Sequence, residues 1–98
     1  MSDTNVTVQD NPDESRYEAF VNGEQTVAGF ATYERHNGLI AFLHTEVGDE
    51  YGGQGIGSVL VQQSLDDVRT KELTVRPVCP FYKKYLDEHP EYADLLGG

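Results

Sequence analysis

The segment Gly52-Gly53-Gln54-Gly55-Ile56-Gly57-Ser58 separates a stretch of strand-like alternation from a stretch of helical periodicity, and it decides how this chain folds. Glycine has no Cβ atom, so the backbone can reverse sharply, approach an anion closely and point its N–H groups at it. A helix that begins here would add the positive end of its dipole. A plain connecting loop is the alternative, but four glycines between positions 52 and 57 favour a phosphate-binding turn.

Upstream of this turn, two Asn-Gly pairs divide the chain into three predicted strands. Asn22-Gly23 and Asn37-Gly38 suit the positive φ angles of type I′ turns. We therefore expect strands at Tyr17–Val21, Gln25–Glu34 and Leu39–Val47, paired as an antiparallel meander. The third strand is apolar in both alternating registers, which predicts a central strand that is covered on both faces.

Downstream, the apolar period changes to that of a helix. We expect a helix over Ile56–Lys71, a strand over Glu72–Val78 and a second helix over Phe81–Glu88. The third and fourth strands flank one helix, so they should pair in parallel through a right-handed crossover. Their carboxyl ends, at Val47 and near Cys79, then meet at one sheet edge, where such folds bind ligands. The sequence thus predicts a small α/β (α+β) domain.

Length and composition exclude several classes of protein. A chain of 98 residues has room for one domain, which we expect over residues 16–98, and the polar stretch Met1–Ser15 is expected to be a disordered tail. There is no signal-peptide pattern and no apolar run long enough to cross a membrane, so the expected location is cytoplasmic. One cysteine and three scattered histidines predict no disulfide within the chain and no metal site.

The charge balance limits the possible partners. Seven basic against 17 acidic residues give a net charge of −10, which disfavours nucleic acid and suits a cationic partner or simple solubility. Five of the seven basic residues lie between Arg69 and Lys84. That grouping is either chance or a local pocket for an anionic ligand.

The residues of the motif argue against two common types of phosphate-binding loop. A Walker loop needs a lysine after its last glycine, but Ser58 follows Gly57. A dinucleotide fingerprint should follow the first strand of a doubly wound sheet, whereas a meander precedes this turn. Neither pattern fits.

A third pattern fits better. Gly55-Ile56-Gly57 resembles the Gly-x-Gly of the acetyl-CoA pyrophosphate loop, Gln/Arg-x-x-Gly-x-Gly/Ala, of the GNAT N-acetyltransferase superfamily, with Gly52 in the place of Gln or Arg. Val75-Arg76-Pro77-Val78-Cys79 is similar to the superfamily's Val-x-Pro-x-Asn, with the cysteine at the Asn position. Together with Cys79-Pro80-Phe81 and His89-Pro90-Glu91-Tyr92, it resembles the superfamily's minimal branch, in which a whole protein has about 100 residues.

The resemblance implies a small GNAT-like fold and the transfer of an acetyl group from acetyl-CoA to a primary amine. Pantetheine would pass between the third and fourth strands. The residues expected to bind the coenzyme are Val47, Gly52, Gly53, Gln54, Gly55, Ile56, Gly57, Ser58, Tyr82 and Lys83. The chain departs from full-size members in having Leu86 where a tyrosine acid is usual, with Tyr85 one position early, and in lacking the opening strand and helix pair.

Cys79 and His44 are the candidate catalytic residues. Cys79 precedes Pro80 and is therefore expected at a helix N-terminus, which favours a thiolate. The resemblance implies that it is either a nucleophile that accepts the acetyl group or a proton donor, whereas the plain alternative is a small buried residue. His44, on the face of Phe42 and Glu46, could act as a base or orient the thiol, or be structural.

Two other functions stay open at this point. The missing tyrosine and the missing elements are also compatible with a CoA-binding or acyl-CoA-binding module without turnover. An acidic interaction protein is the second alternative.

Overall fold

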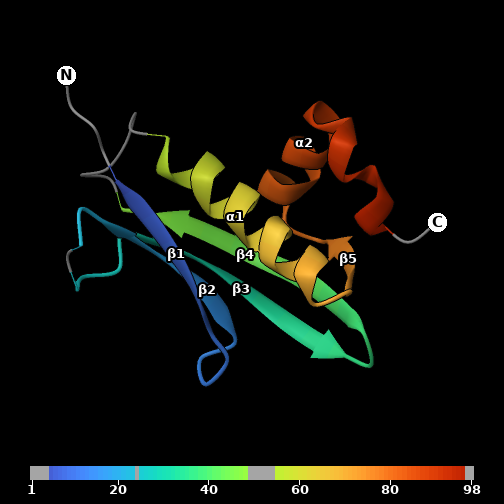
Figure 1. The fold of residues 1–98 in the computed structure, drawn as a ribbon, viewed down its shortest axis with the longest axis horizontal. Helices are drawn as coiled ribbons and strands as arrows, with labels where there is room; N and C mark the ends of the chain where they lie inside the picture. The colour runs from blue at the N-terminus through green and yellow to red at the C-terminus, as the bar shows by residue number, and fades with distance from the viewer. Residues whose placement is uncertain (1–4, 24, 49–54, 97–98) are drawn as a thin grey trace.

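The chain folds into one five-stranded sheet with two helices on one of its faces (Figure 1). The computed structural model describes residues 5–23, 25–48 and 55–96. The strands run in the order β1-β2-β3-β4-β5, antiparallel up to β4, while β5 is parallel to β4. The elements are β1 (Val6–Asn11), β2 (Arg16–Val21), β3 (Gly29–His36), β4 (Leu39–Val47), α1 (Ile56–Thr70), β5 (Thr74–Pro77), α2 (Pro80–Glu88) and the 3-10 helix η2 (Pro90–Leu96).

The predicted meander, helix, parallel strand and C-terminal helix are confirmed. Both Asn-Gly pairs have the positive φ angles expected of them, with Asn37 at 48° and Gly38 at 87°. The second pair joins β3 and β4 directly, because His36 pairs with Leu39. The first pair does not form a two-residue hairpin, since the N–H of Asn22 donates to the carbonyl of Asn5 and β3 begins only at Gly29.

The expectation of a disordered tail is wrong for Val6–Asn11, which form β1 at the edge of the sheet. The cause is a short alternation of apolar and polar residues within a stretch whose overall composition is polar. Val6 and Val8 are half-buried against the core, while Thr7 and Gln9, which alternate with them, are exposed. The meander thus has four strands rather than three.

A second expectation, that Leu39–Val47 is covered on both faces, is also wrong. Ile40 and Phe42 are fully buried beneath the helices, but Leu43, on the same strand, is 37% exposed. In the described part of the chain, both helices pack on the same side of the sheet (Figure 1). The other face, which we call the open face, has no element packed on it among these residues.

A polar network ties the first two strands and β3 to the end of α1. Tyr17 donates its hydroxyl to Asp67 at 2.6 Å, and Tyr33 donates to Asp10 at 2.5 Å. Lys71 lies 2.8 Å from the Asp67 carboxylate and 3.0 Å from that of Asp10. The network therefore links β1, β2 and β3 to the last turn of α1 through groups that are partly buried.

Burial and hydrogen bonding move the pKa values of this network. Burial, together with the hydrogen bond to a carboxylate, raises the pKa of both tyrosines, Tyr17 and Tyr33, well above the ordinary value. Partial burial opposes ionisation of Asp67 and Lys71, but their hydrogen bonds and Coulomb attractions to each other and to neighbouring groups together outweigh it, so the pKa of Asp67 is lowered and that of Lys71 is raised. All four shifts favour the protonation states present at neutral pH.

We expect this network to make the fold sensitive to alkali. A raised folded-state pKa contributes stability below the ordinary value, near 10 for tyrosine, and that contribution is lost as the pH rises further. The free energy of unfolding, measured by urea denaturation, should stay constant up to about pH 9 and fall as the pH rises above about 10. Tyr17→Phe should cost about 1–2 kcal/mol at neutral pH and flatten this dependence. A flat profile in the unmodified protein would contradict the role given to the network.

Candidate functional site

The two parallel strands separate at a defined point. β4 and β5 pair only from Leu39 with Thr74 to Phe42 with Pro77. The last link is the N–H of Cys79, which donates to the carbonyl of Phe42 at 2.8 Å. β4 continues to Val47, and from Leu43 onward it has no strand partner on this side among the described residues. The separation leaves a strand edge whose backbone groups are available to a ligand.

A β-bulge in β4 lies at the same point. Tyr33 of β3 pairs with Phe42, and the preceding residue, Thr32, pairs with His44, so Leu43 is left without a partner in the ladder. One extra residue in a strand reverses the faces to which all later side chains point. Beyond the bulge, Thr45 therefore shares the helix-covered face with Phe42.

Cys79 and Thr45 meet at this separation. The thiol Sγ lies 3.4 Å from Thr45 Oγ1, and Cys79 is only 4% exposed. Cys79 is the N-cap of α2, as expected, and its carbonyl accepts the N–H of Lys83. Its thiol makes no capping hydrogen bond. The sulfur is thus held between the end of β5 and the unpaired part of β4.

The bulge places His44 elsewhere than the sequence predicts. His44 does not share a face with Phe42, because the extra residue turns it onto the open face. There its Nε2 lies 3.2 Å from the carboxylate of Glu46, and both side chains are 61% exposed. The expectation that His44 orients Cys79 is therefore wrong, and Thr45, which the sequence analysis missed, occupies that position.

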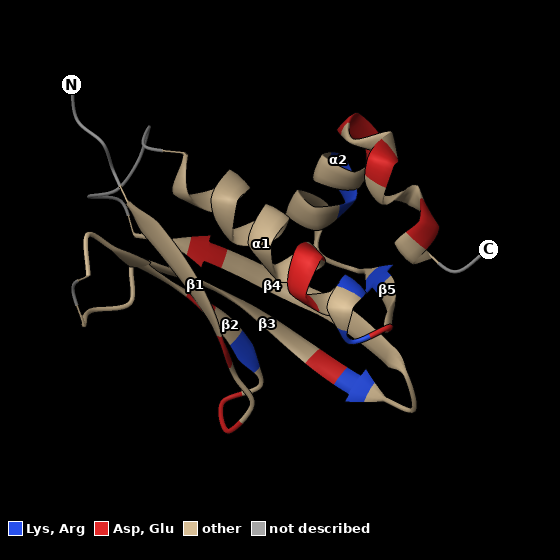
Figure 2. Cartoon of the chain, in the orientation of Figure 1, with Lys and Arg blue, Asp and Glu red and all other residues tan. Residues whose placement is uncertain are grey.

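The N-terminus of α1 lies beside this separation. Gly55 is its N-cap with φ 73°, a left-handed conformation that glycine adopts without strain. No side chain caps the helix, so the first N–H groups, over Ile56–Ser58, have no acceptor within the helix. No charged residue occurs in α1 before Asp66, which leaves this half of the helix uncharged (Figure 2). Gly52, Gly53 and Gln54 lie outside the described residues.

Gly57 is required for a specific close approach. A Cβ atom at this position would lie 2.6 Å from Cζ of Phe81 and 3.6 Å from Cγ2 of Val47. The ring of Phe81 therefore rests directly on the first turn of α1, and Val47 lies next to it. Phe81 remains 42% exposed, which is unusual for a large apolar side chain in contact with a helix.

A cleft of about 430 Å³ opens between α1 and α2. Five α2 residues and one α1 residue line it: Pro80, Phe81, Lys84, Tyr85, Glu88 and Ser58. The positions from Phe81 to Glu88 follow the i, i+3, i+4, i+7 spacing of one helix face. We call this face of α2 the cleft face.

Two predicted coenzyme contacts, Tyr82 and Lys83, are not on the cleft face. Tyr82 is fully buried, stacks on Phe42 with the ring centroids 4.0 Å apart, and its hydroxyl oxygen is hydrogen-bonded to Ser64 Oγ at 2.7 Å. Burial raises its pKa well above the ordinary value. Lys83 is exposed and does not line the cleft. The helical spacing of Phe81, Lys84 and Tyr85 was the signal in the sequence that could have identified this face.

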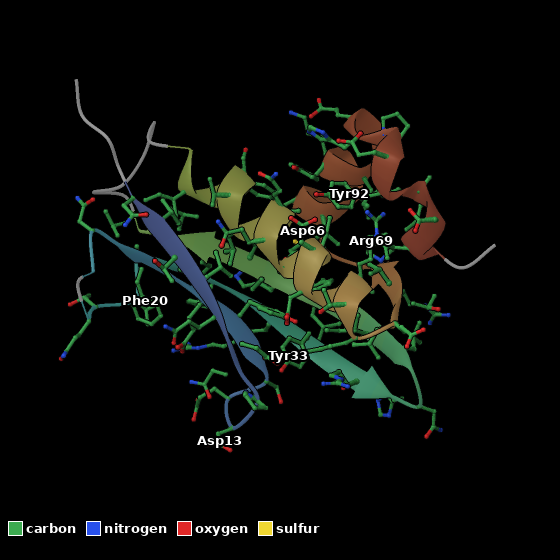
Figure 3. All side chains as sticks on the ribbon, viewed as in Figure 1. Asp13, Phe20, Tyr33, Asp66, Arg69 and Tyr92 are labelled. Atoms are coloured by element: carbon green, nitrogen blue, oxygen red, sulfur yellow. The ribbon has the colours of Figure 1, made fainter. Side chains whose placement is uncertain are left out.

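The C-terminal segment is joined to α1 by a hydrogen bond and an ion pair. Tyr92 donates its hydroxyl to Asp66 at 2.7 Å, and Arg69 pairs with Asp94 at 2.6 Å (Figure 3). Partial burial and the hydrogen bond to Asp66 raise the pKa of Tyr92 to about 12. These contacts hold η2 against α1.

Neither a membrane-spanning helix nor a metal cluster occurs in the described ranges. No helix there is long and apolar enough to span a membrane. No group of three or more His, Cys, Asp or Glu side chains in those ranges has the arrangement needed to hold a metal ion.

The contact between Gly57 and Phe81 can be tested by a double-mutant cycle. Alanine is the better helix former, but at this position its methyl group must displace the ring. We expect Gly57→Ala to stabilise the Phe81→Ala variant by about 0.5 kcal/mol, and to stabilise the unmodified protein less or not at all. Urea denaturation measures both effects. Equal effects in the two backgrounds would contradict the contact.

Comparisons with known proteins identify the family to which this site belongs. The family model described as GCN5-related N-acetyl-transferase matches residues 16–95. The solution structure of a GCN5-like protein from Staphylococcus aureus superimposes with a TM-score of 0.68 at 26% identity, over 91% of this chain and 85% of that one.

Curated relatives agree with this assignment. Protein NATD1 is 36% identical over 60 residues in both Mus musculus and Homo sapiens, and the match covers 59% of this chain. It spans about half of the relatives' own length, 54% and 53% respectively. The family match, which includes both the glycine turn and the separating strands, carries the assignment: this chain belongs to the GCN5-related N-acetyltransferases.

Proposed function

We propose that this protein transfers an acetyl group from acetyl-CoA to a primary amine. The observation that carries the proposal is the separation of β4 from β5 beside the uncapped N-terminus of α1. A strand edge and a set of free helix N–H groups thus lie next to each other. Acetyl-CoA needs both, because its pantetheine arm is an extended chain with two amides and its diphosphate is an anion.

Three parts of the coenzyme, namely pantetheine, the diphosphate and the thioester, could each find a partner among the described residues. The amides of pantetheine can pair with the free edge of β4 between Leu43 and Val47, as an added strand would. The diphosphate can accept N–H groups from Ile56, Gly57 and Ser58, where the helix dipole favours negative charge. The thioester would then lie where the strands separate, beside Cys79 and Thr45.

The reaction requires proton transfers that this site could provide. Attack by the neutral amine nitrogen on the thioester carbon forms the C–N bond, breaks the C–S bond and releases the thiolate of CoA. The amine loses one proton, and the CoA thiolate gains one. Cys79 could give its proton to that thiolate and later be reprotonated. Alternatively its thiolate attacks first, releasing CoA, and the acetyl group then passes from Cys79 to the amine.

The acceptor amine would approach from the open face. His44 and Glu46 lie there, directly beyond the bulge, and their pair at 3.2 Å suits a group that removes a proton from an ammonium ion. The net charge of −10 would attract a cationic acceptor to this surface. His44 is thus proposed as the base, without any contact to Cys79.

The direct test is titration with acetyl-CoA, followed by incubation with a panel of primary amines and measurement of the free CoA thiol released. Heat of binding and thiol release together are expected. Binding without release would indicate a non-catalytic acyl-CoA-binding module. Absence of both would leave an acidic interaction protein and overturn the proposal.

The role of Cys79 can be separated from coenzyme binding. Cys79→Ser should lower transfer about a hundredfold or more, because serine is far less acidic, while the affinity for CoA stays within about twofold. Mass spectrometry of the unmodified protein after exposure to acetyl-CoA alone distinguishes the two routes, since only the covalent route leaves acetyl on Cys79. Unchanged turnover in the serine variant would remove Cys79 from the mechanism.

The role of His44 has a matched control in His36, a second exposed histidine at the end of β3. His44→Gln should lower the rate of transfer at least about tenfold near neutral pH, while His36→Gln leaves it unchanged. The loss should shrink at high pH, where the acceptor amine is already neutral. Equal effects of the two substitutions would contradict a catalytic role for His44.

A further inference from the structure

We infer that the acceptor amine is carried on an unbranched alkyl chain, as in a lysine side chain or a free diamine, and that a small pocket at the carboxyl end of β4 binds it. The inference rests on the proposed function and deepens it, because it names the class of acceptor. The pocket, which we call the strand-end pocket, has a volume of about 200 Å³. Its walls come from the start of β3, the residues just before it and the end of β4.

The size of the strand-end pocket limits what can enter it. Pockets for drug-sized ligands hold about 300–1,000 Å³, so a pocket of about 200 Å³ suits one group of the size of a side chain rather than a nucleotide or an oligosaccharide. Gly29 leaves the β3 wall without a side chain. A Cβ atom there would lie 2.9 Å from the carbonyl oxygen of Glu46 and 3.1 Å from Cγ2 of Val47.

The strand-end pocket combines apolar walls with a carboxylate. Val27, Phe30 and Val47 are half-buried, and Ala28 is buried. Glu46 is the one charged residue among the described residues that line the pocket, and its side chain is 61% exposed. A lysine side chain has the matching division, because its stem of methylene groups packs on apolar surface while its ammonium group stays near water. The ammonium group would donate hydrogen bonds to the carboxylate.

The β3–β4 ladder places this carboxylate beside the proposed base. Phe30 pairs with Glu46, and the next pair on the open face is Thr32 with His44. The carboxylate of Glu46 lies 3.2 Å from Nε2 of His44. An ammonium ion bound to Glu46 would therefore lie next to the nitrogen that is proposed to remove its proton. It would also lie along Leu43–Val47, the part of β4 at which the coenzyme arm is proposed to bind.

The charges around the strand-end pocket favour a cation. Among the described residues, His44 is the only ion-pair partner of Glu46. Arg16 lies over the ring of Phe30, 4.7 Å from its centroid, but its charge is paired with Glu18 at 2.7 Å. That stacking shows that the ring of Phe30 accepts a cation beside it. An ammonium group is thus favoured over a neutral or anionic one, and the net charge of −10 acts in the same direction.

Binding of the acceptor can be measured without coenzyme, by NMR titration of the backbone amide signals. The first two probes are Nα-acetyl-lysine methylamide and Nα-acetyl-norleucine methylamide, which share an alkyl stem but differ in the ammonium group. The lysine probe should shift the signals of Phe30, Glu46 and Gly48, which line the pocket, and bind at least about tenfold more tightly than the norleucine probe. Shifts confined to other parts of the molecule would overturn the assignment of the pocket.

Two further probes define the class of acceptor. Cadaverine carries the same ammonium group on an unbranched chain without peptide groups. Tighter binding of the lysine probe than of cadaverine indicates a polypeptide acceptor, the reverse indicates a free diamine, and either result supports the inference. Glucosamine carries its amine on a ring and should bind at least about fivefold more weakly than the lysine probe. Equal binding of glucosamine would overturn the preference for an unbranched chain.

The role of Glu46 has a matched control in Glu34. Glu34 is an exposed carboxylate that alternates with Phe30 on the open face of β3 and does not line the strand-end pocket. Glu46→Gln should reduce the preference for the lysine probe over the norleucine probe to about twofold or less, and Glu34→Gln should retain it. Each substitution removes one negative charge, so a general electrostatic effect would appear in both variants. The amide spectrum of each variant shows whether it is folded.

The outcomes separate this inference from the proposed function. Equal binding of the lysine and norleucine probes, or equal losses in the two glutamine variants, overturns the role of the strand-end pocket while acetyl-CoA binding and thiol release stand. Failure to bind acetyl-CoA, with the binding of the lysine probe intact, overturns the proposed function and leaves an amine-binding pocket.

Discussion

The extra residue at Leu43 determines which side chains the site contains. Without it, the alternation of β4 would place His44 and Glu46 under the helices, next to Cys79. With it, Thr45 contacts the thiol, and the histidine and its carboxylate partner lie on the other side of the sheet. One backbone irregularity thus divides the candidate chemistry between two faces. A thioester at the separating strands would lie between these faces, with the sulfur on one side and the base on the other.

The two helices contribute different kinds of group to the candidate site. α1 supplies backbone N–H groups and no charge over its first half, so its N-terminus is attractive to anions of any shape. α2 supplies side chains, through an aromatic ring seated on Gly57 and the cation of Lys84. Asp66 and Arg69 of α1 bond to Tyr92 and Asp94 of the C-terminal segment and hold η2 against α1.

The sequence predicted the architecture well and the site only in part. The bounds of Leu39–Val47 and the start of α1 at Ile56 were correct, because apolar period and Asn-Gly turns are local signals. The edge strand β1 was missed because only two of its residues, both valines, are apolar, and this gives too short an alternation to indicate a strand. The bulge could not be predicted, since it depends on register with β3, which the sequence of β4 alone does not contain. The face of α2 that lines the cleft was not predicted either, because the rotation of a helix about its axis is set by packing.

That rotation is fixed by Tyr82. Its ring is stacked on Phe42 of the sheet and its hydroxyl is bonded to Ser64 of α1, so two other elements hold this side chain of α2. Tyr82 therefore fixes the rotation of α2 about its own axis. Any rotation of the helix would separate the ring from Phe42 and leave the tyrosine hydroxyl without a hydrogen-bond partner in the core. Substitutions meant to alter the cleft face should accordingly leave Tyr82 in place and change only the residues that α2 presents outward.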